Sequence, residues 1–437
     1  MRELTRPFGF WTTICMVVGS MVGSGIFVLP ATLAPSGWTG TASWFVGGVG
    51  VIAIAMVLVG LTSAKPEEPS ILTICGHSLG LLPGRLIAWS YWVSTWCSAA
   101  VVALVGAGYL LRALPVPMSS NWASALLGSV IIAFLTVVQL VGVQWAGRIQ
   151  VLTTAIKLVP LVVVMAIIGF VALTSPSSFS GPGIPSLELG KLTPALAIAF
   201  FALIGFDSAG IIAERVSNPR RNVVRATLVG LMLVLGIYIV ISTGIMLLTP
   251  IADLSASSSP LADFATRFLG PGAGVIMALF AGISAVGCLN GTILASAELP
   301  LGMVRDGQLP GWMARTTVRE VPAAALVLAS TLAIVLILLG VTGFGARVFD
   351  FMLRLTTASA LWFYAGICLA GLAAGIRRGF AVVGLGFCSW LLYGTGFEAG
   401  SLGMLLMVVA VPLHFLIGTA REIAPKQADI GSKAMAS

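Results

Sequence analysis

Long apolar runs separated by short polar segments make up most of this chain. A run of roughly 20 apolar residues is the length that a helix needs to cross the hydrocarbon core of a bilayer. The runs are continuous, whereas the strands of a membrane barrel alternate over about 10 residues. The pattern therefore predicts an all-α membrane protein with twelve transmembrane helices, at residues 9–34, 39–64, 84–112, 121–142, 147–174, 191–215, 223–248, 271–304, 322–340, 347–375, 379–397 and 400–419.

The composition agrees with this pattern, since 58% of the residues are hydrophobic and 9% are charged. Soluble domains average about 25% charged residues, so these charges are too few to cover a water-facing surface. The first run is longer than the apolar region of a signal peptide and has no cleavage site after it, which predicts a retained span. The cysteines are scattered singly, without metal-ligand spacing or a disulfide pattern, and no cofactor is predicted.

Positive charge sets the direction of the helices, because cytoplasmic loops carry an excess of Lys and Arg. With the N-terminus inside, 17 of the 23 Lys and Arg residues fall on the cytoplasmic side, four fall outside, and Lys157 and Arg354 lie within spans. We therefore predict a multi-pass protein of the cell (inner) membrane with both termini in the cytoplasm. The net charge of +8 reflects this bias and does not indicate a nucleic-acid partner.

Two segments outside the spans have the pattern of short surface helices. Residues 65–83 contain an amphipathic stretch that ends at Leu79, and we expect it at the cytoplasmic interface. Residues 259–269 start with Ser-Pro, a helix start signal, and we expect them to cap the outer face.

The first and sixth spans both carry signs of a break. Span 1 has Gly19, Gly23 and Gly25, and each glycine weakens a helix by roughly 1 kcal/mol relative to alanine. Span 6 has Gly205 beside Asp207. Interrupted helices at corresponding places in two halves point to a substrate site at the midplane. The spacing predicts inverted repeats at 1–175 and 176–378, with appended spans at 379–420 and a tail at 421–437.

The two breaks suggest how a small molecule is held. A half-helix N-terminus at Gly23 to Gly25 presents unpaired amides to a carboxylate, and carbonyls near Phe201 to Ile204 can accept from an ammonium group. The alternative is that the glycines only allow close helix packing. The candidate substrate-binding residues are Ser20, Met21, Gly23, Ser24, Gly25, Ser94, Thr95, Ser98, Phe201, Leu203, Ile204, Gly205, Asp207, Thr292 and Arg354.

Three motifs resemble one known family. Gly19-Ser-Met-Val-Gly-Ser-Gly-Ile-Phe27 with Pro30 resembles the first-span signature of the amino acid–polyamine–organocation superfamily. Ile204-Gly-Phe-Asp207 with Asn218-Pro-Arg-Arg-Asn222 resembles its sixth span and following loop, and Met303-Val-Arg-Asp-Gly307 resembles the end of its eighth span. The most similar subgroup is the bacterial basic amino acid/polyamine antiporters, which include the arginine/agmatine exchanger. The resemblance implies the five-plus-five inverted-repeat fold of the leucine-transporter type, alternating access and amino acid or amine substrates.

Lys157 lies on span 5, where an unpaired ammonium is costly, so a functional role is the default interpretation. In family members a lysine at the similar position occupies the site that holds sodium in sodium-coupled relatives. That implies sodium-independent transport, with Lys157 as a fixed cation or a proton carrier. The alternative is that its side chain extends to the cytoplasmic interface.

Asp207 either caps the second half-helix or couples proton binding to transport. The matching position of the arginine/agmatine exchanger resembles a proton-sensing glutamate. Arg354 on span 10 either pairs with Asp350 one turn away or meets Asp207 in the cavity, and Glu298 on span 8 is a further possible partner. The exchanger stacks its substrate on an aromatic side chain of span 8; Thr292 stands at that position, which argues against arginine.

These features favour a secondary transporter, working by exchange or coupled to protons, over an enzyme. The chain has His77 and His414 but no protease motif on a span. A neutral or small amino acid is favoured because Arg354 could neutralise Asp207. A cationic amino acid or polyamine antiporter is the alternative, and a channel or a non-transporting amino acid sensor are further ones. The expected partners are the substrate, protons and the lipid bilayer, in a monomer or homodimer.

Overall fold

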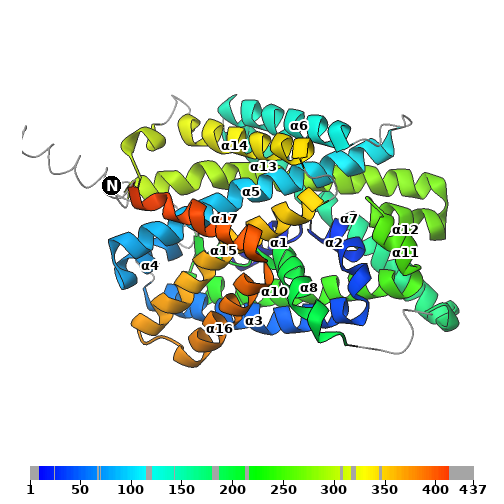
Figure 1. Cartoon of the computed structure of the whole chain (residues 1–437), viewed down its shortest axis with the longest axis horizontal. Helices are drawn as coiled ribbons and strands as arrows, with labels where there is room; N and C mark the ends of the chain where they lie inside the picture. Colours follow the sequence, from blue (N-terminus) through cyan, green and yellow to red (C-terminus); the bar gives the residue numbers. More distant parts are fainter. Residues whose placement is uncertain are drawn as a thin grey trace, which may run out of the picture.

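The computed structural model describes residues 9–412 except 24, 66–67, 69, 115–120, 142, 180–186, 212–215, 306–308, 316–320 and 344–346. Its α-helices are α1 (Phe10–Met21), α2 (Gly25–Leu33), α3 (Trp38–Ala64), α4 (Ile71–Leu79), α5 (Leu81–Ala113), α6 (Asn121–Val141), α7 (Val143–Thr174), α8 (Leu189–Leu203), α9 (Ser208–Ile211), α10 (Pro219–Leu248), α11 (Ile251–Ala256), α12 (Pro260–Leu269), α13 (Pro271–Arg305), α14 (Ala323–Gly343), α15 (Arg347–Ala373), α16 (Arg378–Gly394) and α17 (Phe397–Val408). Figure 1 shows α4 near one end of the long axis and α11 and α12 near the other.

Eight of the described helices are each long and apolar enough to cross a membrane: α3, α5, α6, α7, α10, α13, α14 and α15. Two bent pairs raise this number to ten, α1 with α2 at 43° and α16 with α17 at 117°. Predicted span 6 is divided between α8 and α9. The prediction of a multi-span helical protein is confirmed, and the count of twelve spans stays a prediction.

Both predicted surface helices are present as α4 and α12. The Ser70 hydroxyl caps α4 by accepting from the Thr73 amide at 3.3 Å, as small polar N-cap residues do. The Asn218-Pro219 motif after span 6 explains where α10 starts. Asn218 takes the left-handed conformation (φ 48°) and Pro219 begins α10, so the helix starts sharply there.

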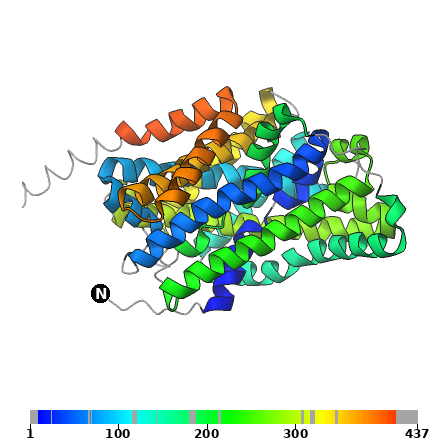
Figure 2. The same ribbon diagram turned by 90° about the horizontal axis from the view of Figure 1, so that it is seen from below.

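The helices pack in matched pairs. α1 packs on α10 and α8 packs on α3, while α13 packs on α7 and α5 packs on α15. Figure 2 shows α3, in blue, beside α10, in bright green. The glycines of α3 allow close packing on two neighbours, because a Cβ on Gly48 would come within 2.5 Å of Leu235 on α10 and one on Gly50 within 2.4 Å of Phe387 on α16. These glycines therefore pack inside the chain.

Candidate functional site

The break in span 1 lies where the sequence predicts it, between the end of α1 at Met21 and the start of α2 at Gly25. A Cβ on Gly23 would come within 2.5 Å of the Cys288 Sγ atom, and one on Gly25 within 2.6 Å of the Ala202 Cβ atom. The glycines thus serve close packing as well as the break. Ser24, a predicted site residue, lies outside the described residues.

The break in span 6 separates α8 from α9 and touches the first break. Gly205 has φ 109°, a backbone conformation that residues with a side chain rarely adopt. A Cβ there would lie 3.1 Å from the backbone of Ser20. The Ser20 Oγ atom is 2.9 Å from the Gly205 carbonyl oxygen and 3.0 Å from the Ser208 Oγ atom. The two interrupted segments therefore meet, as a shared substrate site requires.

Two long side chains bind the carbonyl groups at the end of α1. The Lys157 ammonium donates to the Gly19 carbonyl at 3.1 Å, and the Tyr238 hydroxyl donates to the Met21 carbonyl at 2.6 Å. The last carbonyls of a helix have no partner within it, and a positive charge is favourable at this end of the helix dipole. Lys157 is 1% exposed, so its side chain does not extend to the interface.

Asp207 is buried at the break of span 6 and accepts two tyrosine hydroxyls. Tyr91 on α5 donates to its carboxylate at 2.6 Å, and Tyr364 on α15 donates at 2.8 Å. The Tyr364 ring stacks on Phe206 with ring centroids 5.0 Å apart, which fixes the direction of this hydroxyl. No cationic side chain among the described residues forms an ion pair with Asp207.

Arg354 does not meet Asp207, and this corrects one of the interpretations above. Its guanidinium pairs with Asp350, one turn away on α15, at 2.8 Å. Tyr364, which binds Asp207, lies ten residues further along α15, or about 15 Å at the helical rise per residue. Arg354 is therefore too far along the helix to neutralise the carboxylate, and its place as a substrate-binding residue is not supported by these contacts.

The remaining predicted site residues lie on α1, α5, α8 and α13 or at the break of span 6. The Ser94 and Thr95 hydroxyls donate to carbonyls of their own helix at 2.7 Å, and Thr292 does the same on α13 at 3.0 Å. Met21, Phe201 and Leu203 are buried, and Ser98 and Ile204 are half-buried. The hydroxyls that bond their own helices contribute less polarity to a cavity than the sequence suggested.

The sequence model of the amino acid permease family matches residues 8–433, nearly the whole chain. The chain belongs to this family. The permease is 30% identical to a putative arginine/ornithine antiporter of Bacillus subtilis over 387 residues, which are 82% of each chain. It is 27% identical to an arginine/ornithine antiporter of Pseudomonas aeruginosa over 74% of this chain and 69% of the relative, and 23% identical to a cadaverine/lysine antiporter of Escherichia coli over 92% and 94%.

The permease is therefore a multi-pass membrane transporter of the amino acid–polyamine–organocation superfamily and not an enzyme. The predicted superfamily, the transport activity and the helical membrane class are confirmed.

Sequence reasoning missed the tyrosines of the permease. The chain has five tyrosines, and all but Tyr393 are buried. Tyr91 and Tyr364 bind Asp207, Tyr238 binds the end of α1, and Tyr109 donates to the Phe27 carbonyl of α2 at 2.5 Å. A buried tyrosine usually finds a hydrogen-bond partner. Each of the few tyrosines within the spans was therefore a signal in the sequence for a polar partner nearby.

Proposed function

We propose that the permease is a sodium-independent antiporter of cationic amino acids or diamines that works by alternating access. Asp207 is the observation that carries this proposal. It is a carboxylate buried beside the junction of the two breaks, with two tyrosine hydroxyls and no described cation as partners. A buried charge is costly without a compensating charge, and a cationic substrate would supply one during transport.

The case for a neutral substrate is weaker than the sequence indicated. It rested on Arg354 neutralising Asp207, and Arg354 pairs with Asp350 instead. The Lys157 ammonium donates to the Gly19 carbonyl and not to Asp207. Nothing among the described contacts of Asp207 therefore replaces the positive charge of a substrate, and the names of the relatives above point in the same direction.

Within the cationic class, Thr292 favours aliphatic amines of the ornithine or cadaverine kind over a guanidinium. A planar guanidinium gains from stacking on an aromatic face, and the hydroxyl of Thr292 is bonded to its own helix. The α-carboxylate of an amino acid would lie on the amides at the start of α2. Its α-ammonium would lie on carbonyls near Ile204, because both groups are left open by the breaks.

The Lys157 contact supports sodium independence. In the resemblance noted above, this ammonium takes the place of a sodium ion beside span 1, and here it is bonded to the backbone of α1. Lys157 and Asp207 are the two candidates for proton coupling, since both are buried and ionisable.

The matched helix pairs support two inverted repeats. If spans 1–5 correspond to spans 6–10, the α1–α10 contact corresponds to α8–α3, and α13–α7 corresponds to α5–α15. We therefore retain the predicted boundaries at 175 and 378, with both termini in the cytoplasm of the inner membrane. The interfacial α4 and the outer α11 and α12 would then lie on opposite sides.

Counterflow in sodium-free proteoliposomes tests the proposal. Vesicles loaded with unlabelled L-ornithine would accumulate labelled L-ornithine and cadaverine, and labelled L-leucine would stay near background. Accumulation of labelled L-leucine in vesicles loaded with unlabelled L-leucine, with no L-ornithine counterflow, would establish a neutral substrate. Binding of L-ornithine without counterflow would establish a sensor, and flux that rises linearly without saturation would establish a channel.

A further inference from the structure

The accessible polar atoms at the two breaks belong to the inner halves of the broken spans. Ser20 lies in the last turn of α1, and Ser208 is the first residue of α9. In the proposed orientation these two helices are the cytoplasmic halves of spans 1 and 6. The Ser20 side chain is exposed, and Gly205 and Ser208 are half-buried, whereas Asp207 is completely buried. A solute at the breaks therefore meets the two hydroxyls before it meets the carboxylate.

These exposed atoms face water and not lipid. Backbone outside a helix is tolerated at membrane depth only where it is buried in protein or lines a water-filled cavity. Gly205 lies in the turn between α8 and α9, and the hydrogen bond of its carbonyl group to Ser20 is exposed. The cluster of Ser20, Gly205 and Ser208 therefore lines a cavity on the cytoplasmic side of the breaks.

The cluster has too few hydrogens for its acceptors. The Ser20 Oγ atom lies 2.9 Å from the Val17 carbonyl oxygen, and it lies 2.9 Å from the Gly205 carbonyl oxygen. The Ser208 Oγ atom is a third acceptor at 3.0 Å. A hydroxyl has one hydrogen and two lone pairs, so Ser20 can satisfy one of these oxygens at a time. An ammonium group has three hydrogens and no acceptor, and it supplies what the cluster lacks.

The electrostatic surroundings favour a weakly held cation. α1 and α8 both end at the breaks, and the carbonyl end of a helix favours positive charge. The carboxylate of Asp207, the neighbour of Ser208 in the chain, adds to this preference when it is ionised. The Lys157 ammonium, which binds the Gly19 carbonyl beside Ser20, opposes it. A cation at the two serines is therefore attracted but can leave.

We infer that the Ser20 and Ser208 hydroxyls form an inner subsite for an alkylammonium group of the substrate. The two hydroxyl oxygens accept hydrogen bonds from the ammonium, which occupies the subsite between Asp207 and the cytoplasm. The subsite rests on the proposed transport of cationic substrates, and it adds a position that the substrate takes as it enters or leaves on the cytoplasmic side.

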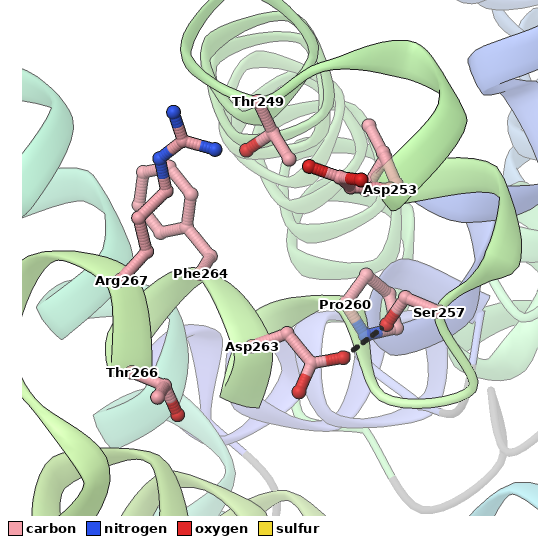
Figure 3. A pocket seen from close by; sticks show the side chains of 9 residues that line it. Thr249, Asp253, Ser257, Pro260, Asp263, Phe264, Thr266 and Arg267 are labelled. Atoms are coloured by element: carbon pink, nitrogen blue, oxygen red, sulfur yellow. Dashed lines mark hydrogen bonds between the residues drawn. The ribbon is translucent and has the colours of Figure 1, made fainter.

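The groove that the structure describes at the outer face is separate from this subsite. It encloses about 280 Å³ among α10, α11 and α12 and shares none of its lining residues with the breaks. Figure 3 shows that one of its acidic side chains, Asp263, is bonded to Ser257. A change at Ser208 should therefore alter binding from the cytoplasmic side and leave binding from the outer face unchanged.

The test measures L-ornithine exchange at each face, in inside-out and in right-side-out membrane vesicles loaded with unlabelled L-ornithine and free of sodium. Ser208→Ala should raise the KM at the cytoplasmic face about tenfold, the scale of a lost hydrogen bond to a charged group. The KM at the outer face and the kcat should stay at the wild-type values. Ser208→Thr keeps a hydroxyl and should restore the cytoplasmic KM.

Cadaverine shows whether the subsite takes an ammonium group alone. It has two ammonium groups and no carboxylate, so Ser208→Ala should raise its cytoplasmic KM as well. An increase for L-ornithine with none for cadaverine would contradict the inference. Ser389→Ala on α16 is the matched control, because the Ser389 hydroxyl is exposed and bonds its own helix at 2.9 Å. Its KM values should equal those of the wild type.

The outcomes separate the subsite from a structural role and from the transport proposal. If the two serines only join the breaks, Ser208→Ala would lower kcat and the unfolding temperature without a difference between the two faces, and the subsite would be overturned. An unchanged cytoplasmic KM would overturn it too. A wild type that exchanges neither L-ornithine nor cadaverine would overturn the proposed function, and the subsite with it.

Discussion

At the scale of single residues, buried donors complete the two broken helices. Tyr238 and Lys157 bind carbonyls at the end of α1, and Tyr91 and Tyr364 bind the carboxylate at the break of span 6. These hydrogen bonds join helices that are distant in the sequence. They therefore tie the two breaks to the helices around them.

Removing one hydroxyl from Asp207 should slow exchange. Tyr364→Phe keeps the ring that stacks on Phe206 and loses the 2.8 Å hydrogen bond. A hydrogen bond to a charged group is worth roughly 1.5–3 kcal/mol, so we expect the initial exchange rate to fall about tenfold. Tyr393→Phe is the control, because Tyr393 is 84% exposed. Equal rates in the two variants would mean that the Tyr364 contact has no part in transport.

Lys157→Met should reduce both stability and transport. The change keeps the length of the side chain but leaves the Gly19 carbonyl without its donor. A buried acceptor without a partner costs roughly 1–3 kcal/mol, which lowers the unfolding temperature in detergent. Lys191→Met at the outer pair with Glu188 is the control. Wild-type stability and wild-type exchange in Lys157→Met would contradict the role assigned to this residue.

At the scale of the helices, the breaks depend on glycine for two reasons. Gly23 and Gly25 leave room for side chains of α13 and α8, and Gly205 takes a backbone conformation that a Cβ disfavours. Sequence reasoning located both breaks, because clustered glycines and a charged residue within an apolar run are local signals. It likewise located Lys157 and Asp207.

The contacts between distant helices could not be read from the sequence. Tyr364 is 157 residues from Asp207 along the chain, and nothing local indicates which hydroxyl reaches the carboxylate. For the same reason, the sequence left open whether the Arg354 guanidinium pairs with Asp350 or with Asp207. The structure resolves it because Arg354 and Tyr364 lie far apart along α15.

Gly205→Ala tests the break in span 6 directly. Alanine there must adopt φ 109° and bring its Cβ 3.1 Å from Ser20, so we expect loss of exchange and a destabilised protein. Gly236→Ala in α10 is the matched control, because nothing lies within 4 Å of its Cβ. It should stabilise the helix by up to about 1 kcal/mol. Normal exchange in Gly205→Ala would show that the strained turn is dispensable.

At the scale of the whole molecule, the orientation can be checked by labelling with a membrane-impermeant maleimide in intact cells. We expect Phe397→Cys, at the start of α17, to react from outside, and His77→Cys on α4 to react only after permeabilisation. Both positions are exposed. The background is Cys15→Ser with Cys288→Ser, which removes the thiols that are not buried. The opposite labelling pattern would invert the proposed topology.

The most direct test of the central claim compares two aspartates in sodium-free proteoliposomes. Asp207→Asn removes the buried carboxylate proposed to bind the substrate cation, whereas Asp350→Asn removes the partner of Arg354 away from that site. We predict that L-ornithine counterflow is lost in Asp207→Asn and retained in Asp350→Asn, with both proteins folded. Retained L-ornithine counterflow in Asp207→Asn would contradict the account.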